Sequence, residues 1–400
     1  MLRVALVGGG HAMLPTIRNA GAWIRDEVAH VTLFDASPQL YYSGMIPEYL
    51  GGVYSEQQVS IDLGSLCRRS SIEFRPHAVT RIDPTTHTIT DATGGSFPFD
   101  VIAVNIGGRN PGLPADATPT KPLHRLPQLH RQITSVLDRP GDTLSLLIAG
   151  GGAAGVEIAM NVTARFLAAG RQGDLTCTIV EGESTLLPGF ASGLQQHVDS
   201  VLSHRGVDIR TDSRVASVKD SRTHLSDGSC MEADCVLWAT GVTGSDVLRD
   251  SSLPTDERGF LKVNQTLSVE QHPRIFAAGD CAVVDGFQEL PRVGVHAVKQ
   301  GPALFTNLDR TVRALHRSRI PPPDGQLASF RPYGVAPLIL STGTPEGLWV
   351  SNGLWWKGRS ALRMKHWIDR RWIHPYNEAF DTWSLSLARA DAPLSHTNGT

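Results

Sequence analysis

Two glycine-rich turns, each lying between a short apolar strand and a helical segment, constrain this chain more than any other feature. The first turn, Gly8–Gly10, follows the apolar residues 2–7, and the second, Gly150–Gly152, follows residues 144–149. In both cases the next apolar strand completes a stretch of roughly thirty residues, which is the length of a βαβ unit with parallel strands. Two such units predict an α/β chain with two Rossmann-like dinucleotide-binding domains.

The first unit carries the residues expected of a dinucleotide site. Gly8 allows a tight turn, and Gly10 lets the backbone approach a pyrophosphate, which the N–H groups of the following helix then bind. Asp35 ends the next strand, where a carboxylate can accept hydrogen bonds from a ribose. Met13 stands where a third glycine or an alanine is usual, so we expect different packing between helix and strand. A nucleotide-free turn is the alternative interpretation.

A downstream apolar strand, residues 275–278, indicates that the first dinucleotide is FAD. It ends in Gly279 and Asp280, which would place a carboxylate against the ribitol hydroxyls of a flavin and allow close contact at the glycine. The helix after residues 292–294 would direct its positive end at the flavin and favour the anionic reduced ring. A plain buried aspartate at a strand end is the alternative.

The second turn matches the dinucleotide pattern at all three glycine positions, which are Gly150, Gly152 and Gly155. Glu181 closes the next strand, and its carboxylate favours a free ribose 2′-hydroxyl over a 2′-phosphate, so NADH is expected rather than NADPH. A further strand ends at Gly241 and is expected to pass under the dinucleotide. Three cationic residues nearby remain candidates for binding a phosphate: His204, Arg205 and Arg210.

Glu157, early in the second helix, has two interpretations. Its charge is favourable near the positive end of a helix, so it can be a capping residue. It can equally approach the nicotinamide and relay protons, which would make it a catalytic residue.

Charge and cysteine content disfavour several other classes of protein. The 37 basic and 39 acidic residues leave a net charge of −2, which gives no case for nucleic-acid binding. The five cysteines show no Cys-x-x-Cys spacing, so we expect structural cysteines and no metal site. No signal-like segment precedes the first strand, and the longest apolar stretch, residues 144–162, is interrupted by glycines and charge. A reducing, cytoplasmic location is therefore expected.

Glycine- and proline-rich stretches divide the chain. Residues 107–114 and 241–246 suggest two crossings between domains, and residues 319–325 suggest a linker. The expected division is an FAD-binding domain over residues 1–112 and 244–325, an NAD(H)-binding domain over residues 113–243, a C-terminal module over residues 326–388 and a disordered tail over residues 389–400.

The C-terminal module contains an amphipathic helix in which tryptophans alternate with cations. Its apolar residues fall on one helical face: Ala361, Met364, Trp367, Ile368 and Trp372. This pattern is typical of a helix that lies in a membrane interface and favours anionic lipid. It fits equally well a helix whose apolar stripe packs on the body of the protein while its charges are solvated.

Taken together, these residues resemble the pyridine-nucleotide oxidoreductases of the type II NADH dehydrogenase branch. Within that branch the sequence is most similar to the NADH-dehydrogenase-like flavoproteins that occur fused to selenide,water dikinase. The likeness continues to about Tyr376 and includes the segments 42–47, 121–123, 293–301, 338–343 and 365–370. It implies the glutathione-reductase-like FAD/NAD(P)-binding fold.

The resemblance also implies roles for particular residues. It places Ser43, Gly44, Met45 and Pro47 against the flavin, Gly107 at the end of a strand beside FAD, and Gln300 on the opposite side of the ring. The dithiol branch of the superfamily carries a cysteine pair in the segment that corresponds to residues 41–54, and this chain has none there. Disulfide reduction is therefore not expected. Sulfide:quinone oxidoreductases also need cysteines beside the flavin, and neither Cys177 nor Cys230 suits that role.

The electron acceptor that the resemblance implies is a quinone or another small molecule. Type II dehydrogenases line the quinone pocket with a glutamine pair; Gln300 matches one member, and His296 stands one turn earlier at the other position. A histidine there can donate a proton to a reduced quinone, or it can simply bind a backbone carbonyl.

The expected function is that of an FAD-dependent NADH dehydrogenase, which transfers hydride from NADH to FAD and then two electrons to a quinone. Two alternatives stay open. One is a soluble NAD(P)H-flavin oxidoreductase that passes electrons to a protein or to a selenium or sulfur species. The other is a non-catalytic flavoprotein that senses redox state. A location on the inner face of the cell membrane and a homodimer are both compatible with the sequence.

Overall fold

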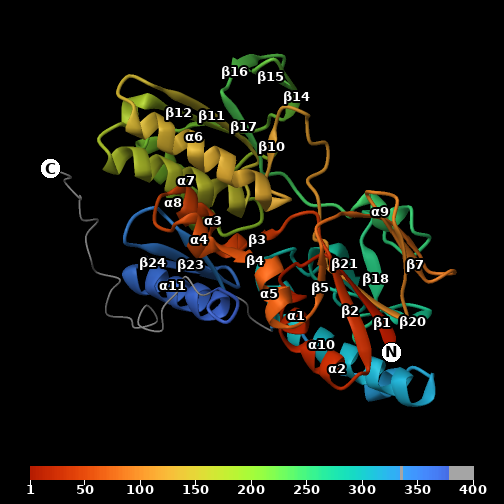
Figure 1. The fold of residues 1–400 in the computed structure, drawn as a ribbon. Coiled ribbons are helices and arrows are strands. Elements are labelled where there is room, and N and C mark those ends of the chain that lie inside the picture. Colours follow the sequence, from red (N-terminus) through yellow and green to blue (C-terminus); the bar gives the residue numbers. More distant parts are fainter. Residues whose placement is uncertain (334–336, 378–400) are drawn as a thin grey trace.

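The structure is a computed structural model that describes residues 1–333 and 337–377 (Figure 1). It contains two largely parallel sheets covered by helices, together with a small antiparallel module near the end of the described chain. The fold class is the predicted α/β arrangement with two Rossmann-like dinucleotide-binding domains. The end of the expected C-terminal module, residues 378–388, and the expected tail, residues 389–400, lie outside the described residues.

The larger sheet has eight strands in the order β21-β18-β19-β20-β9-β1-β2-β5. Their bounds are β1 (Leu2–Val7), β2 (Ala29–Phe34), β5 (Glu73–Arg75), β9 (Val101–Val104), β18 (Leu261–Val263), β19 (Ser268–Val269), β20 (His272–Ala277) and β21 (Ala282–Val284). Strand β1 lies between β2 and β9 and is parallel to both. The strand order therefore reverses at β1, and ligands of open α/β sheets bind at the carboxyl ends of strands at such a point.

The second sheet repeats this arrangement with five parallel strands in the order β10-β17-β11-β12-β13. Their bounds are β10 (Thr118–Pro119), β11 (Leu144–Ala149), β12 (Leu175–Val180), β13 (Asp208–Arg210) and β17 (Cys235–Trp238). Here the order reverses at β11, directly before the second glycine turn. The central strands of both sheets are almost wholly buried, which explains why they are continuous apolar runs in the sequence.

Helices connect and cover these sheets, and smaller antiparallel sheets extend from them. The helices are α1 (Leu14–Asn19), α2 (Gly21–Arg25), α3 (Ile46–Leu50), α4 (Glu56–Val59), α5 (Leu63–Arg69), α6 (Leu126–Asp138), α7 (Ala153–Ala168), α8 (Ser192–His204), α9 (Asp246–Arg249), α10 (Gly294–Ser318) and α11 (Arg359–Ile373). The smaller sheets are β3 (Gln39–Tyr41) with β4 (Ser60–Asp62); β6 (Val79–Asp83), β7 (Thr88–Asp91) and β8 (Ser96–Pro98); β14 (Val215–Lys219), β15 (Arg222–Leu225) and β16 (Cys230–Glu232); and β22 (Leu338–Ser341), β23 (Gly347–Ser351) and β24 (Leu354–Gly358).

The chain passes from the larger sheet to the second sheet and back along two adjacent segments. Arg109 and Thr243 exchange backbone hydrogen bonds of 2.9 Å in both directions. The Asn110 side chain donates to the carbonyl oxygens of Thr240 at 3.0 Å and of Gly241 at 3.3 Å. These contacts lie where the sequence suggested crossings, and they fix the two crossing segments to each other.

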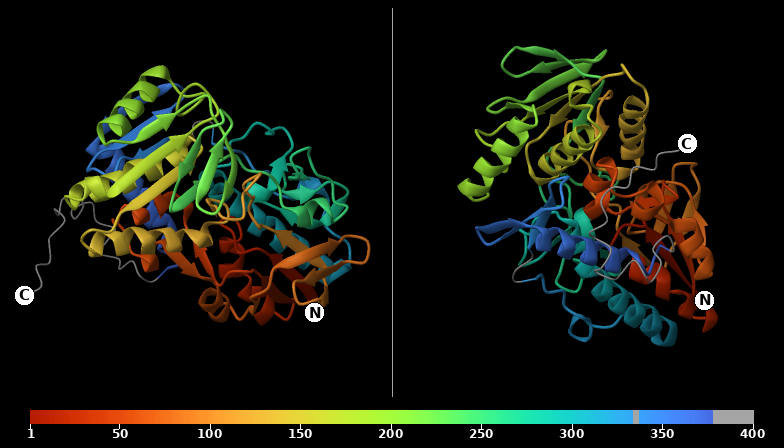
Figure 2. Two further views of the ribbon diagram at one scale, coloured as in Figure 1. Left: turned by 90° about the horizontal axis from the view of Figure 1, so that it is seen from above. Right: turned by 90° about the vertical axis from the view of Figure 1, so that its left-hand side faces the viewer.

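The C-terminal module, formed by β22–β24 and α11, contacts both of the larger units (Figure 2). On one side, Asn161 of α7 donates to the Ser341 hydroxyl at 2.8 Å, and the Trp355 ring stacks on His197 of α8 with centroids 5.3 Å apart. On the other side, Trp372 of α11 stacks on Tyr42 with centroids 4.3 Å apart. The module therefore holds the two dinucleotide-binding units together.

The apolar stripe predicted for α11 does not form a single packing face. Ala361 is buried, but Trp367 and Ile368 are 45% and 40% exposed. The buried face follows i, i+4 spacing and includes two charged residues, Lys365 and Asp369, because charged partners on other elements meet them. Among the helices of residues 1–333 and 337–377, none combines the length and the apolar character needed to cross a bilayer.

Candidate active site

The first glycine turn forms a backbone cradle at the carboxyl end of β1. Gly8 has φ +85°, and a Cβ there would lie 2.5 Å from the carbonyl oxygen of Asn105. A Cβ on Gly10 would collide with the Asn105 side chain, so no larger residue fits either position. Asp35, at the end of β2, accepts hydrogen bonds from Gly9 N at 2.7 Å and Ser37 N at 2.8 Å. Burial raises the pKa of its carboxyl, although both hydrogen bonds oppose that shift.

Asn105, directly after β9, organises this cradle, and the sequence analysis did not identify it. Its Oδ1 accepts hydrogen bonds from Ala12 N at 3.0 Å and Met13 N at 3.2 Å, in the turn directly before α1. Its Nδ2 donates to the Ala278 carbonyl at 2.6 Å. The only signal in the sequence is a polar residue after a wholly apolar strand. Gly107 lies two residues further on, with φ +71° and open space where a Cβ would be.

Asp280 lies beside the cradle in a short turn after β20. Its Oδ2 forms an ion pair with Lys121 Nζ at 2.5 Å, and the two side chains are only 11% and 25% exposed. Burial is the largest single effect and acts to raise the pKa of this carboxyl, but the charge and hydrogen bond of Lys121, together with weaker nearby charges, hold the pKa below its ordinary value. The other carboxylate oxygen, Oδ1, has no hydrogen-bond partner in the described part of the chain.

Gln300 and His296 lie one turn apart on α10 and face the Asp280 turn. Gln300 Oε1 accepts a hydrogen bond from Gly279 N at 2.5 Å, so the amide carbonyl holds the turn. Both residues line a small cavity together with Gly279 and Asp280. His296 Nδ1 is buried without a hydrogen-bond partner in the described residues, and no bond from this ring to a backbone carbonyl is present there. Burial, followed by the Lys299 charge, lowers the pKa of His296.

The segment Ser43–Met45 is a single 3₁₀ turn that leads into α3. The Ser43 hydroxyl lies 2.9 Å from the position of a Cβ on Gly294, so it touches the first residue of α10. The Gly44 carbonyl accepts a hydrogen bond from Lys365 Nζ of α11. Met45 and Pro47 are buried. The structure thus places this segment between the N-terminus of α10 and α11.

The second glycine turn repeats the geometry of the first. Gly150 has φ +116°, and a Cβ there would lie 2.5 Å from the Ala239 carbonyl oxygen, whereas a Cβ on Gly152 would meet nothing within 4 Å. Gly155 of α7 packs directly on the Gly150 carbonyl. Glu181 accepts hydrogen bonds from Gly151 N at 2.6 Å and Glu183 N at 2.9 Å, as Asp35 does in the first unit.

The predicted phosphate-binding candidates are mostly engaged elsewhere. Arg205 donates to the carbonyls of Met160 at 2.6 Å and Thr342 at 2.8 Å, and Arg210 donates to Asp208 at 2.9 Å. His204 is the last residue of α8. A further cation beside the end of β12 is Arg214, whose Nε is 2.6 Å from the position of a Cβ on Gly182. The sequence analysis missed Arg214 because only tertiary structure brings it there.

Glu157 is buried where α7 meets the C-terminal module. Its Oε1 accepts hydrogen bonds from Ser341 N at 2.8 Å and from the Ser341 hydroxyl at 2.9 Å. Burial raises the pKa of Glu157 to about 7, although the Lys365 charge acts in the opposite direction. The carboxylate faces β22, so the capping interpretation of Glu157 is wrong and the functional one stays a prediction.

Lys365 of α11 lies close enough to Glu157 for its charge to act on that carboxyl, and it belongs to a larger buried cluster. Its ammonium group lies 2.8 Å from Glu48 Oε2 and 2.9 Å from Asp369 Oδ2. The Tyr42 hydroxyl donates to Asp369 Oδ1 at 2.9 Å, and His366 Nε2 lies 2.5 Å from Glu48 Oε1. We name these residues the acid–lysine cluster. The sequence analysis assigned no role to Glu48 or to this lysine, although the spacing of Lys365 and Asp369 places them on one helical face.

His11, the residue after the first glycine turn, borders the same region. Its ring lies 5.1 Å from Trp372 and 5.4 Å from Tyr42 between centroids. Its Nε2 is buried and has no hydrogen-bond partner within the described chain. Burial, followed by the Lys121 charge, lowers the pKa of His11 to about 4, so the ring is neutral at pH 7.

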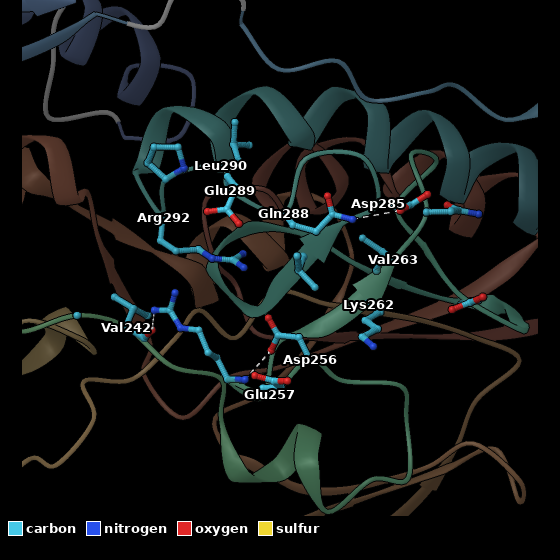
Figure 3. Close-up of a pocket in the computed structure, with 16 residues that line it drawn as sticks. Val242, Asp256, Glu257, Lys262, Val263, Asp285, Gln288, Glu289, Leu290 and Arg292 are labelled. Atoms are coloured by element: carbon cyan, nitrogen blue, oxygen red, sulfur yellow. Dashed lines mark hydrogen bonds between the residues drawn. The ribbon is translucent and has the colours of Figure 1, made fainter. Parts of the chain in front are cut away.

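A cavity of about 930 Å³ opens next to the Asp280 turn, between the crossing segment at Gly241 and the loop 285–292 (Figure 3). Arg258 and Arg292 both lie over the buried Phe260 ring, at 5.3 Å and 3.9 Å from its centroid. Arg258 also donates to the Val242 carbonyl at 2.6 Å. The cavity therefore extends from the second crossing segment to the loop that leads into α10.

The cysteines contribute no dithiol to this region. Cys177 lies within β12 and Cys230 within β16. Cys281 adjoins Asp280, but its thiol contacts the carbonyls of Ala278 and Val104, and burial raises its pKa to about 11.

Comparisons with known proteins agree with this geometry. The family described as pyridine nucleotide-disulphide oxidoreductase matches residues 2–301. The type II NADH:quinone oxidoreductase of Staphylococcus saprophyticus is 25% identical over 393 residues, covering 92% of this chain and 94% of the relative. That of Staphylococcus aureus is 24% identical over 392 residues, covering 92% of this chain and 94% of the relative.

Two solved structures show the same fold. NDH2 from Plasmodium falciparum in complex with NADH superimposes with a TM-score of 0.75 at 12% identity, covering 96% of this chain and 99% of that one. The sulfide:quinone oxidoreductase of Aquifex aeolicus superimposes with a TM-score of 0.73 at 15% identity, covering 94% of this chain and 92% of that one.

Proposed function

We propose that this chain, which belongs to the pyridine nucleotide-disulphide oxidoreductase family and is an FAD-dependent NADH oxidoreductase, delivers its electrons to a quinone. The observation that carries the choice of acceptor is the buried acid–lysine cluster with Glu157 beside it. A quinone takes up two protons along with two electrons, and Glu157 is a buried acid whose pKa of about 7 suits proton transfer at neutral pH. The segment 41–54 has no cysteine, so a disulfide relay is not available for the electrons.

The residues of the first cradle suit FAD. Gly8 and Gly10 allow the close turn at which a pyrophosphate would approach the backbone, and Asp35 lies at the end of β2, where it is positioned for a ribose. The free Oδ1 of Asp280 is an acceptor for a ribitol hydroxyl. When bound, FAD supplies the two-electron chemistry that accepts a hydride and passes electrons onward.

The second cradle suits NADH. Gly150, Gly152 and Gly155 form the turn and the close helix contact. Glu181 presents a carboxylate where the adenosine ribose of a dinucleotide lies, which favours a free 2′-hydroxyl. These residues bind and orient the reduced coenzyme.

Three side chains are candidates for donating protons to the quinone or for holding the residues around it in place. Gln300 holds the Gly279 turn through its amide carbonyl, so its role is positioning. The buried Nδ1 of His296 has no hydrogen-bond partner within the described chain, and the ring faces the cavity at Asp280, so His296 is a candidate proton donor by position. Burial lowers its pKa and so acts against the protonated form. Glu157, held by Ser341, is the second candidate proton donor.

A water-insoluble acceptor also requires contact with a membrane surface. The outward side of the C-terminal module exposes Leu354, Trp356, Trp367 and Ile368, at 71%, 40%, 45% and 40% of their surface. The cations Arg359 and Arg371 are exposed on the same helix. Apolar and aromatic side chains beside arginines suit an anionic lipid surface, so we include peripheral membrane binding in the proposal.

Anaerobic stopped-flow spectroscopy tests the choice of acceptor. Purified yellow protein is reduced with NADH and then mixed with a menaquinone analogue while the flavin absorbance is followed. The expected result is reoxidation whose rate rises with quinone concentration and which slows at least tenfold in Glu157→Gln. Unchanged reoxidation in His296→Phe would exclude His296 from proton donation. Reoxidation that does not depend on quinone concentration would contradict the proposal itself.

A further inference from the structure

Lys121 comes from a segment that belongs to neither cradle, yet its ammonium group reaches into the first one. It lies just after β10, the edge strand of the second sheet, and its Nζ is 2.5 Å from Asp280 Oδ2. Asp280 is only 11% exposed, so this is a largely desolvated ion pair. Such a pair interacts more strongly than one on the surface and is screened little by salt.

The backbone of Lys121 is fixed by the crossing segments. Lys121 N donates to Asn110 Oδ1 at 2.8 Å. The Nδ2 of the same asparagine donates to the carbonyls of Thr240 and Gly241, which follow β17 and border the coenzyme side. One asparagine therefore holds both crossing segments and sets the position from which Lys121 reaches Asp280.

The negative charge of Asp280 needs a nearby cation to balance it, and Lys121 is the cation in contact with it. The lowered pKa keeps the Asp280 carboxylate ionised, but a fixed negative charge beside a bound FAD would oppose the uptake of electrons. His11 faces the same carboxylate and is neutral, because burial lowers its pKa to about 4. Arg292 is the other nearby cation, but it donates to the Ala282 carbonyl and its guanidinium lies over Phe260. Lys121 is thus the cation in direct contact with Asp280.

We propose that Lys121 is a positioning residue that cancels the charge of Asp280, so that the carboxylate can bind FAD through its free oxygen without lowering the reduction potential of the flavin. This inference rests on the proposed function only in requiring bound FAD; it is independent of the acceptor. It also gives the Lys121–Asp280 pair two separable effects. The carboxylate provides affinity for FAD, and the lysine preserves the ease of reduction.

The two effects predict different behaviour for single and double variants. Lys121→Met leaves an uncompensated carboxylate, so the equilibrium constant for flavin reduction falls at least tenfold, which is about 30 mV for two electrons. Asp280→Asn weakens FAD binding at least tenfold. In the double variant both charges are absent, so the reduction equilibrium returns to within threefold of wild type while FAD binding stays weak.

The test is an anaerobic titration of the holoprotein with dithionite in the presence of a reference dye, together with FAD titration of the apoprotein. Variants that lose flavin during purification are reconstituted with excess FAD before the titration. Lys121→Arg, which keeps the charge, and Lys219→Met, which removes an exposed lysine of β14, are expected to stay within threefold of wild type. An unchanged reduction equilibrium in Lys121→Met, or a double variant as hard to reduce as Lys121→Met, overturns the inference. Protein that binds no FAD at all would instead overturn the proposed function.

Discussion

A single buried carboxyl, Glu157, couples the protonation state of this protein to its stability. In the folded chain its pKa is about 7, raised from the ordinary value of 4.5 chiefly by burial. Between these two values the folded protein holds a proton that the unfolded chain releases. The free energy of unfolding therefore falls as pH rises from about 4.5 through 7. In this range the Glu157 carboxyl ionises readily in the unfolded chain but stays largely protonated in the folded protein.

Glu157→Gln removes this dependence, because glutamine keeps the shape of the protonated acid and cannot ionise. At pH 5 we expect the variant and the wild type to unfold at similar urea concentrations. At pH 8.5 the variant should be the more stable by about 3 kcal/mol, since each pKa unit corresponds to about 1.4 kcal/mol. Urea unfolding of both holoproteins across this range measures the difference. Parallel stability curves would show that the Glu157 pKa is not raised.

The sequence identifies residues whose role is local and misses those whose partners are distant. Gly8, Gly150, Asp35 and Glu181 were predictable because turn, strand end and helix start lie within one βαβ unit. Asn105 was not, since the turn that it holds lies 92 residues earlier in the chain. Glu48 and Lys365 are 317 residues apart, and no spacing rule relates them.

At the scale of elements, α11 shows which of two interpretations of its apolar pattern the contacts fit. The stripe was expected either to pack on the body of the protein or to lie in a membrane interface, and Trp367 and Ile368 do not pack on the body. The helix instead turns Lys365 and Asp369 inward, because Glu48 of α3 and the hydroxyl of Tyr42 are there to pair with them. The strands of the two sheets were predictable, by contrast, because strands buried on both faces are continuous apolar runs.

Lys365 should therefore stabilise the docking of α11 more than its surface cations do. In Lys365→Met, Glu48 and Asp369 stay buried without their cation, and removing one partner of a buried ion pair costs about 3–5 kcal/mol. We expect a clear fall in Tm, measured by differential scanning fluorimetry of flavin emission. Arg359→Met, at the exposed start of the same helix, is the matched control and should leave Tm within a degree or so. Equal effects of the two variants would mean that the cluster does not hold the helix in place.

At the scale of the whole molecule, the C-terminal module has two opposite sides. Its inner side contacts α7 and α8 of one unit and the Tyr42 segment of the other, so it closes the region between the two cradles. Its outer side exposes Trp367 and Ile368. In the proposed function, a quinone entering from a lipid surface would reach the acid–lysine cluster beneath the same module.

Co-sedimentation with lipid vesicles tests whether this outer side binds membrane. Wild-type holoprotein should sediment with vesicles that contain phosphatidylglycerol, and less at high salt, because arginines contribute to the attraction. The double variant Trp367→Glu, Ile368→Glu should partition at least tenfold less, since fully burying each side chain contributes about 1.5–3 kcal/mol and 1.4 kcal/mol is a factor of ten. Leu167→Glu alters an equally exposed apolar residue at the end of α7, away from this side, and should sediment like the wild type. If Leu167→Glu loses as much binding as the double variant, charge alone explains the effect, and the outer side of α11 is not the membrane-binding surface.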